Sequence, residues 1–145
     1  MNTQLTLEQS YLALIEFLML SKQRIIEIGT NNHLSSMQTI TLLLLKNPRP
    51  MGTLRRIFNC DASNITGIVD GLEQKNLATR FDINSDRRVK MIRLLPNGKK
   101  LRNILVHELT NDHHYLLGCL SEYETKNFIE LIQKITAATK AQKLT

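Results

Sequence analysis

Mostly apolar residues near the N-terminus recur at steps of three and four, which is the spacing of one face of a helix. Thr6 and Gln9 have the spacing of a capping box, in which two side chains satisfy backbone N–H groups at a helix start. The pattern predicts a first helix from about residue 7 to residue 28, ended by residues 29–32. Its face consists of Leu7, Tyr11, Leu14, Leu18, Lys22 and Ile25, widened by Leu12, Ile15 and Met19.

A second capping box, Ser35 with Gln38, precedes a run of residues that is apolar almost without interruption. Such a run predicts a helix buried on most sides, as expected for the central helix of a small domain. Pro48 and Pro50 end it, because proline cannot extend a helix.

Two helices joined by a tight turn are expected next. The first is short, over about residues 53–58, and Asn59 and Cys60 form the turn. Asp61 caps the second helix by accepting from the N–H groups of its first turn, and Asn76 closes it in a left-handed conformation. The residues expected to face inward are Leu54, Ile57 and Phe58 on the first helix and Ile65, Ile68, Val69 and Leu72 on the second.

Residues 77–83 and 89–95 change period from 3.6 to two, which predicts a β hairpin with its turn at residues 84–86. After Pro96-Asn97-Gly98 a helix resumes and is expected to reach about Leu117. Ser121 and Glu124 form a third capping box, before a last helix and a frayed polar tail over residues 139–145. The residues expected to face inward on the last helix are Phe128, Leu131, Ile132 and Ile135.

The order of helix, tight turn, helix and hairpin predicts a winged helix-turn-helix. The expected fold class is therefore mainly α with a small antiparallel β hairpin. A helix-turn-helix places the N-terminal residues of its second helix against base edges in the major groove of DNA. The residues predicted to contact bases are Ser63, Asn64, Thr66 and Gly67, which face away from the inward stripe.

Charge supports a polyanionic partner. The 145 residues carry a formal net charge of +6, and many of the basic residues fall within or beside the helix-turn-helix and hairpin. Arginine suits the narrow minor groove, and exposed basic residues contact phosphates. The residues predicted to contact the DNA backbone or the minor groove are Arg55, Arg56, Arg87 and Lys90.

Other features bound the location and the class of protein. The chain has no apolar run of the roughly 18 residues that a membrane span needs and no pattern typical of a signal peptide. Cys60 and Cys119 are too few for a disulfide framework, so we expect a cytoplasmic protein. No order of Ser, His and Asp, phosphate loop or pair of carboxylates indicates an enzyme, and no cofactor is expected.

Three segments resemble the MarR family of bacterial transcription regulators. They are residues 61–77 (DASNITGIVDGLEQKNL), the Asp-Arg-Arg at residues 86–88, and the Leu-Pro-Asn-Gly at residues 95–98. The family usually has glycine where this chain has Asn59 and Asn76, a small residue at Arg55 and threonine at Pro96. The chain length and the flanking helices also match, so the resemblance spans essentially the whole chain.

The resemblance implies a homodimer that acts as a transcription regulator, usually a ligand-responsive repressor. It implies one MarR-like domain over residues 1–145, with a winged helix-turn-helix at 35–95 and dimerisation helices at 1–34 and 96–145. It further implies that Arg87 enters the minor groove and that Arg88 pairs with Asp70 to orient the wing. The effector implied is a small aromatic or phenolic molecule.

The signal to which the protein responds is less defined. Tyr11, His33 and Met37 could line an effector pocket, although core or loop positions are the simpler interpretation. Cys60 precedes a helix N-terminus and could sense oxidants, or it could fill a small apolar position. The region from His107 to His114 lacks a pair of histidines at i, i+4, so no metal site is predicted there. A dimeric protein-interaction adaptor without specific DNA binding is the alternative function.

Overall fold

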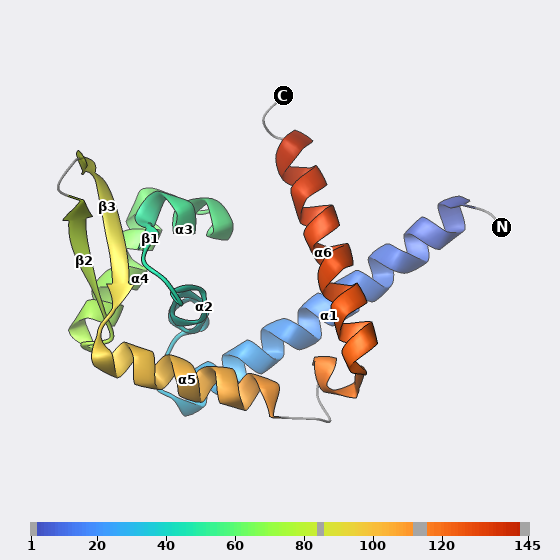
Figure 1. The fold of residues 1–145 in the computed structure, drawn as a ribbon, viewed down its shortest axis with the longest axis horizontal. Coiled ribbons are helices and arrows are strands. Elements are labelled where there is room, and N and C mark those ends of the chain that lie inside the picture. The colour runs from blue at the N-terminus through green and yellow to red at the C-terminus, as the bar shows by residue number, and fades with distance from the viewer. Residues whose placement is uncertain (1–2, 84–85, 112–115, 143–145) are drawn as a thin grey trace. The chain divides into compact units, whose positions relative to one another are not determined.

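The computed structural model describes residues 3–83, 86–111 and 116–142. It divides into two compact units, residues 1–109 and residues 110–145. The fold class is confirmed: the chain is mainly helical with one small antiparallel sheet (Figure 1). The elements of the first unit are α1 (Thr3–Asn31), α2 (Ser36–Leu44), β1 (Arg49–Pro50), α3 (Met51–Phe58), α4 (Ala62–Gln74), β2 (Ala78–Ile83), β3 (Asp86–Leu94) and α5 (Pro96–Thr110). The second unit holds the 3-10 turn η1 (Leu116–Cys119) and α6 (Glu122–Gln142).

The hydrophobic core of the first unit is built from the helices around α2 and from the inner side of the sheet. The two arginines Arg49 and Arg102 donate to the carbonyl oxygens of Leu44 and Leu43 at the end of α2, over 2.8 and 3.1 Å. These bonds satisfy acceptors that a helix C-terminus leaves unpaired. The fully buried apolar side chains include Ile28, Leu42, Leu45, Leu54, Val69, Leu72, Ile92 and Leu105.

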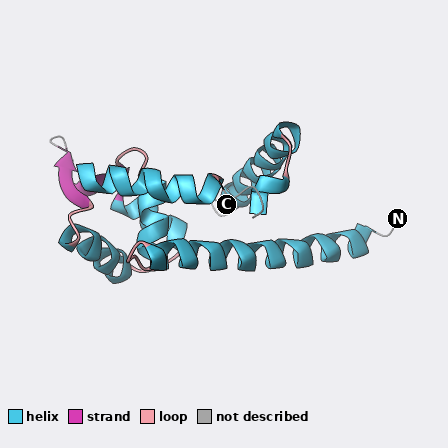
Figure 2. Cartoon of the chain, turned by 90° about the horizontal axis from the view of Figure 1, so that it is seen from below, coloured by secondary structure: helices cyan, strands magenta, loops and turns pink. Residues whose placement is uncertain are grey.

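The sheet has three strands in the order β1-β3-β2, where the sequence predicted a two-stranded hairpin. β1 pairs with β3 through Arg49 opposite Ile92 and Pro50 opposite Met91. Proline is tolerated there because an edge strand can leave one N–H position unused. A strand of two residues is too short to show a period, which is why the pattern did not reveal it. In Figure 2 the strands lie together at one end of the first unit.

The first helix is longer than predicted. It begins at Thr3 rather than near residue 7, so Thr6 lies inside the helix and does not cap it. It continues through Gly29 and ends where His33 adopts a left-handed φ of 57°, with the Leu34 N–H donating to the Gly29 carbonyl over 2.8 Å. A Cβ at Gly29 would lie 2.5 Å from Thr39 Oγ1, so this glycine allows α1 and α2 to approach closely. Figure 2 shows α1 as one uninterrupted helix.

The second unit departs from prediction at both ends. The helix expected to reach Leu117 ends at Thr110, and Leu116 has a left-handed φ of 51°. The capping box of Ser121 with Glu124 is confirmed, since each side chain bonds the other residue's backbone N–H. Residues 139–142, expected to be frayed, continue α6 as helix. None of the helices described is long and apolar enough to cross a membrane.

Candidate nucleic-acid interface

The N-terminus of α4 is organised by Asp61, as the sequence predicted. Asp61 Oδ1 accepts from the Asn64 backbone N–H and from the Ser63 hydroxyl, both over 2.8 Å. These bonds, the Asn64 N–H first and the Ser63 hydroxyl second, hold the pKa of the Asp61 carboxyl below its ordinary value. The Ser63 hydroxyl proton is therefore engaged, so Ser63 presents oxygen lone pairs outward and is better suited to accept than to donate.

The two faces of α4 differ in burial. Ile65, Val69 and Leu72 are buried at the i, i+4, i+7 spacing that the sequence predicted, and Ile68 is half-buried. A Cβ at Gly67 would meet no heavy atom within 4 Å, so packing inside the chain does not require glycine there. The four residues predicted to contact bases are all exposed: Ser63, Asn64, Thr66 and Gly67. Their contact with DNA remains a prediction.

The residues that end α3 and α4 have the expected backbone geometry. Asn59 and Asn76 have left-handed φ values of 48° and 56°, the conformation for which asparagine substitutes for glycine. Arg55 and Arg56 are exposed on α3. The expectation for Ile57 was wrong: its side chain is 49% exposed and does not face the core.

Cys60, the candidate redox sensor, is a free and half-buried cysteine. It packs against the hydrophobic core, which is what the alternative interpretation, a small apolar filler, requires. A role in sensing oxidants is not tested by this packing.

The wing consists of β2 and β3, joined in antiparallel register. Lys90 Nζ lies 2.7 Å from Asp82 Oδ1 on the opposite strand, and both side chains are about half exposed. The Arg93 guanidinium lies 5.0 Å from the centre of the Phe81 ring, a cation–π contact. The backbone of Arg87 and Arg88 belongs to β3, and their side chains lie outside the described part of the structure.

Asp70 has a partner that the sequence analysis did not identify. The sequence resemblance paired Asp70 with Arg88, whose side chain lies outside the described part of the structure, so that pairing remains a prediction. The Arg80 guanidinium of β2 also lies against Asp70, with Nη2 2.5 Å from Asp70 Oδ1. Arg80 also forms an ion pair with Glu73. A signal was available: Thr66, Asp70 and Glu73 repeat at i, i+4, i+7 and therefore share one side of α4.

The Leu-Pro-Asn-Gly segment joins the wing to α5. The Leu95 N–H donates to the Leu77 carbonyl oxygen over 3.0 Å. A Cβ at Gly98 would overlap that same oxygen, so glycine is needed where α5 begins against the start of β2. Leu77, just before β2, is thus in contact with the segment that follows β3, and this contact closes the base of the wing.

Within the described residues, His, Cys, Asp and Glu form no group of three or more that could hold a metal ion. Asp112, His113 and His114 lie outside those residues. His33 ends α1, and its carbonyl accepts from Lys75 Nζ over 3.0 Å, while Tyr11 is exposed.

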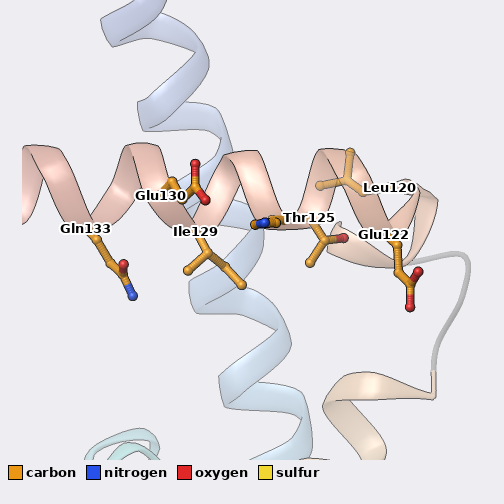
Figure 3. Close-up of a pocket in the computed structure, with 7 residues that line it drawn as sticks. Leu120, Glu122, Thr125, Ile129, Glu130 and Gln133 are labelled. Atoms are coloured by element: carbon orange, nitrogen blue, oxygen red, sulfur yellow. The ribbon is translucent and has the colours of Figure 1, made fainter.

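A hollow in the second unit runs along α6 (Figure 3). Small-molecule sites usually enclose their ligand between several elements. This surface is formed by α6 and Leu120 alone and is not proposed as the effector site. Its lining residues include Leu120, Glu122, Thr125, Ile129, Glu130 and Gln133.

The exposed face of α4 (the recognition helix), the tight turn before it and the paired strands after it define a DNA-binding winged helix-turn-helix protein. Residues 34–90 match the sequence model of the MarR family. An uncharacterized HTH-type transcriptional regulator of Bacillus subtilis, YpoP, is 26% identical over 96 residues, which cover 66% of this chain and 68% of the relative. The winged helix-turn-helix of this chain therefore belongs to the MarR family, as the sequence resemblance indicated.

Solved structures support the same fold. The transcriptional regulator BldR from Sulfolobus solfataricus superposes with a TM-score of 0.80 at 23% identity, over 95% of this chain and 99% of BldR. A mutant MarR from E. coli complexed with operator DNA superposes with a TM-score of 0.65 at 17% identity, over 85% of this chain and 90% of that protein. At these identities the likeness establishes the fold. The family match itself covers the winged helix-turn-helix at residues 34–90.

Proposed function

We propose that a homodimer of this chain binds a specific double-stranded operator and represses transcription until a small aromatic or phenolic effector releases it. The observation that carries the proposal is the outward face of α4, where Asn64 and Thr66 are exposed opposite a fully buried stripe. Asparagine can pair bidentately with adenine in the major groove. Gly67, which has open space at its Cβ position, would let the helix approach the DNA closely.

The dimer is supported by apolar surface that the chain leaves uncovered. Leu14, Leu18 and Met19 on α1 are 39%, 50% and 56% exposed, and α6 exposes Leu131 and Ile135. Large contiguous apolar surfaces on soluble proteins mark interaction sites. A second copy would cover them and supply a second recognition helix, matching the two half-sites typical of dimeric helix-turn-helix proteins.

The effector part of the proposal rests on the family. A ligand can release an operator only if it binds the free geometry of the protein better than the DNA-bound geometry. Titration of the protein–operator complex with a phenolic acid should therefore weaken binding. Unchanged operator affinity across a panel of aromatic and phenolic acids would remove the effector from the proposal and leave DNA binding intact.

DNA binding is tested by an electrophoretic shift of the promoter region that flanks the protein's own gene, repeated across salt concentrations. Asn64→Ala should weaken operator binding by about 1–3 kcal/mol and leave binding to random duplex nearly unchanged. Gln74→Ala is the matched control, because it removes an exposed amide near the other end of α4. Flat salt dependence with no preference over random duplex would instead favour the protein-interaction adaptor.

A further inference from the structure

Arg80 joins the wing to the recognition helix at four points. Its backbone N–H donates to Glu73 Oε1 over 2.8 Å, and its Nη1 bonds Glu73 Oε2. Its Nη2 lies 2.5 Å from Asp70 Oδ1 and 3.1 Å from the carbonyl oxygen of Thr66. One residue of β2 therefore engages two turns of α4, from Thr66 to Glu73.

The placement follows from the two periodicities of the sequence. Thr66, Asp70 and Glu73 each follow by one position a residue of the buried stripe, so their row lies beside the core. Arg80 stands two positions after buried Ala78 on the same face of β2, and its register partner Ile92 is fully buried. The guanidinium thus emerges at the edge of the core, where the row of acceptors on α4 begins.

The charges of Arg80, Asp70 and Glu73 determine how α4 would interact with DNA phosphates. Asp70 and Glu73 are acidic residues on the helix proposed to enter the major groove, and their side chains are 48% and 31% exposed. Unpaired, they would repel phosphates. Arg80, at 26% exposure, neutralises them in part and directs its donors toward α4 rather than toward solvent.

We infer that Arg80 is a positioning residue for DNA binding: it fixes the wing to the recognition helix and neutralises Asp70 and Glu73, without itself contacting DNA. The inference rests on the proposed function. It adds a residue of β2 to the wing-orienting pair of Arg88 and Asp70 that the family resemblance implies.

The test compares operator binding of Arg80→Gln with that of the triple variant Arg80→Gln, Asp70→Asn, Glu73→Gln. Arg80→Gln should lose affinity on the order of tenfold, because two partly exposed ion pairs are broken and two carboxylates are left uncompensated. The triple variant should recover the part of that loss that is due to charge, because no unpaired carboxylate remains, while the part due to the freed wing should persist. Arg93→Gln is the matched control, since it removes the same charge from the same sheet.

Salt dependence separates positioning from direct contact. If Arg80 makes no phosphate contact, the slope of log affinity against log salt should be the same for the triple variant as for the unsubstituted protein. A slope smaller in magnitude by about 1, with no recovery in the triple variant, would show that Arg80 binds a phosphate and would overturn the inference. Unchanged affinity of Arg80→Gln would overturn it equally.

A readout without DNA keeps this inference distinct from the proposed function. The Arg80 amide is bonded to Glu73, so Glu73→Ala should increase its hydrogen exchange in the free protein. Failure of the unsubstituted protein to bind any duplex would refute DNA binding itself, whatever the exchange result. Unchanged exchange in Glu73→Ala would refute the link between wing and helix, even where DNA binds.

Discussion

α4 and the first half of α1 carry the same kind of apolar pattern and have opposite surroundings. In α4 the stripe containing Val69 and Leu72 is fully buried by the chain itself. In α1 the residues Leu14 and Leu18, at equivalent helical spacing, are exposed. Even within α1 the surroundings change, because Ile28 near its end is 1% exposed. Periodicity thus shows which face of a helix is apolar, and the tertiary structure shows whether this chain or another must cover it.

The sharpest test of that difference is a pair of truncations. Leu72→Ala should destabilise the fold by about 2–5 kcal/mol, because Leu72 is fully buried and its loss leaves a cavity. Leu18→Ala should have a smaller effect that depends on protein concentration, because its environment would come from a second copy. Chemical denaturation at several protein concentrations measures both. Equal losses at every concentration would contradict the comparison.

The proposed interface on the exposed face of α1 can be disrupted directly by substitution. Replacing both Leu14 and Leu18 by glutamate should convert the proposed dimer to monomer, measured by sedimentation, because charge cannot be buried unpaired in an apolar interface. Operator affinity should fall roughly 100-fold or more with the loss of bivalent binding. Lys22→Gln is the control on the same helix. A glutamate variant that remains dimeric would place the interface elsewhere.

The wing supplies a third contrast with the two apolar regions. A substitution in the wing should weaken DNA binding without changing folding stability or assembly. Arg87→Ala should weaken operator binding by about 1–3 kcal/mol, through loss of a minor-groove contact. The denaturation midpoint and the sedimentation coefficient should stay unchanged. Full operator affinity at physiological salt would argue against a functional wing.

The smallest expected effect concerns one helix cap in each unit. Hydrogen bonds from the Asn64 and Ser121 backbone N–H groups, respectively, lower the pKa of Asp61 and of Glu124. A carboxyl whose pKa is lowered by folding contributes stability above its unfolded pKa and loses it as pH falls through the folded value. Stability should therefore decline below about pH 4, and less so in Asp61→Asn and Glu124→Gln. Identical acid profiles for all three proteins would contradict the assignment.

The local features were predictable from sequence. Ser35, Asp61 and Ser121 cap helices as expected, because a cap depends on a side chain and backbone groups within three residues of it. Asn59 and Asn76 adopt left-handed conformations for an equally local reason. The buried stripe of α4 and the exposed row opposite it also followed from periodicity.

The long-range features were not predictable. Strand β1 is two residues long and exists only because β3 offers an edge. Arg80, ten positions along the chain, lies against Asp70, and this contact depends on how the hairpin packs on α4. The end of α5 at Thr110 is likewise not marked by a proline or a glycine.

By itself, the sequence determined the winged helix-turn-helix, its caps and the buried stripe of α4, because each of these depends on neighbours within a turn or two of the chain. Only the tertiary structure decided that Arg80 contacts α4 and which apolar faces remain uncovered. Those outcomes depend on groups that are distant in sequence and meet only when β2 packs against α4 or when α1 extends beyond α2.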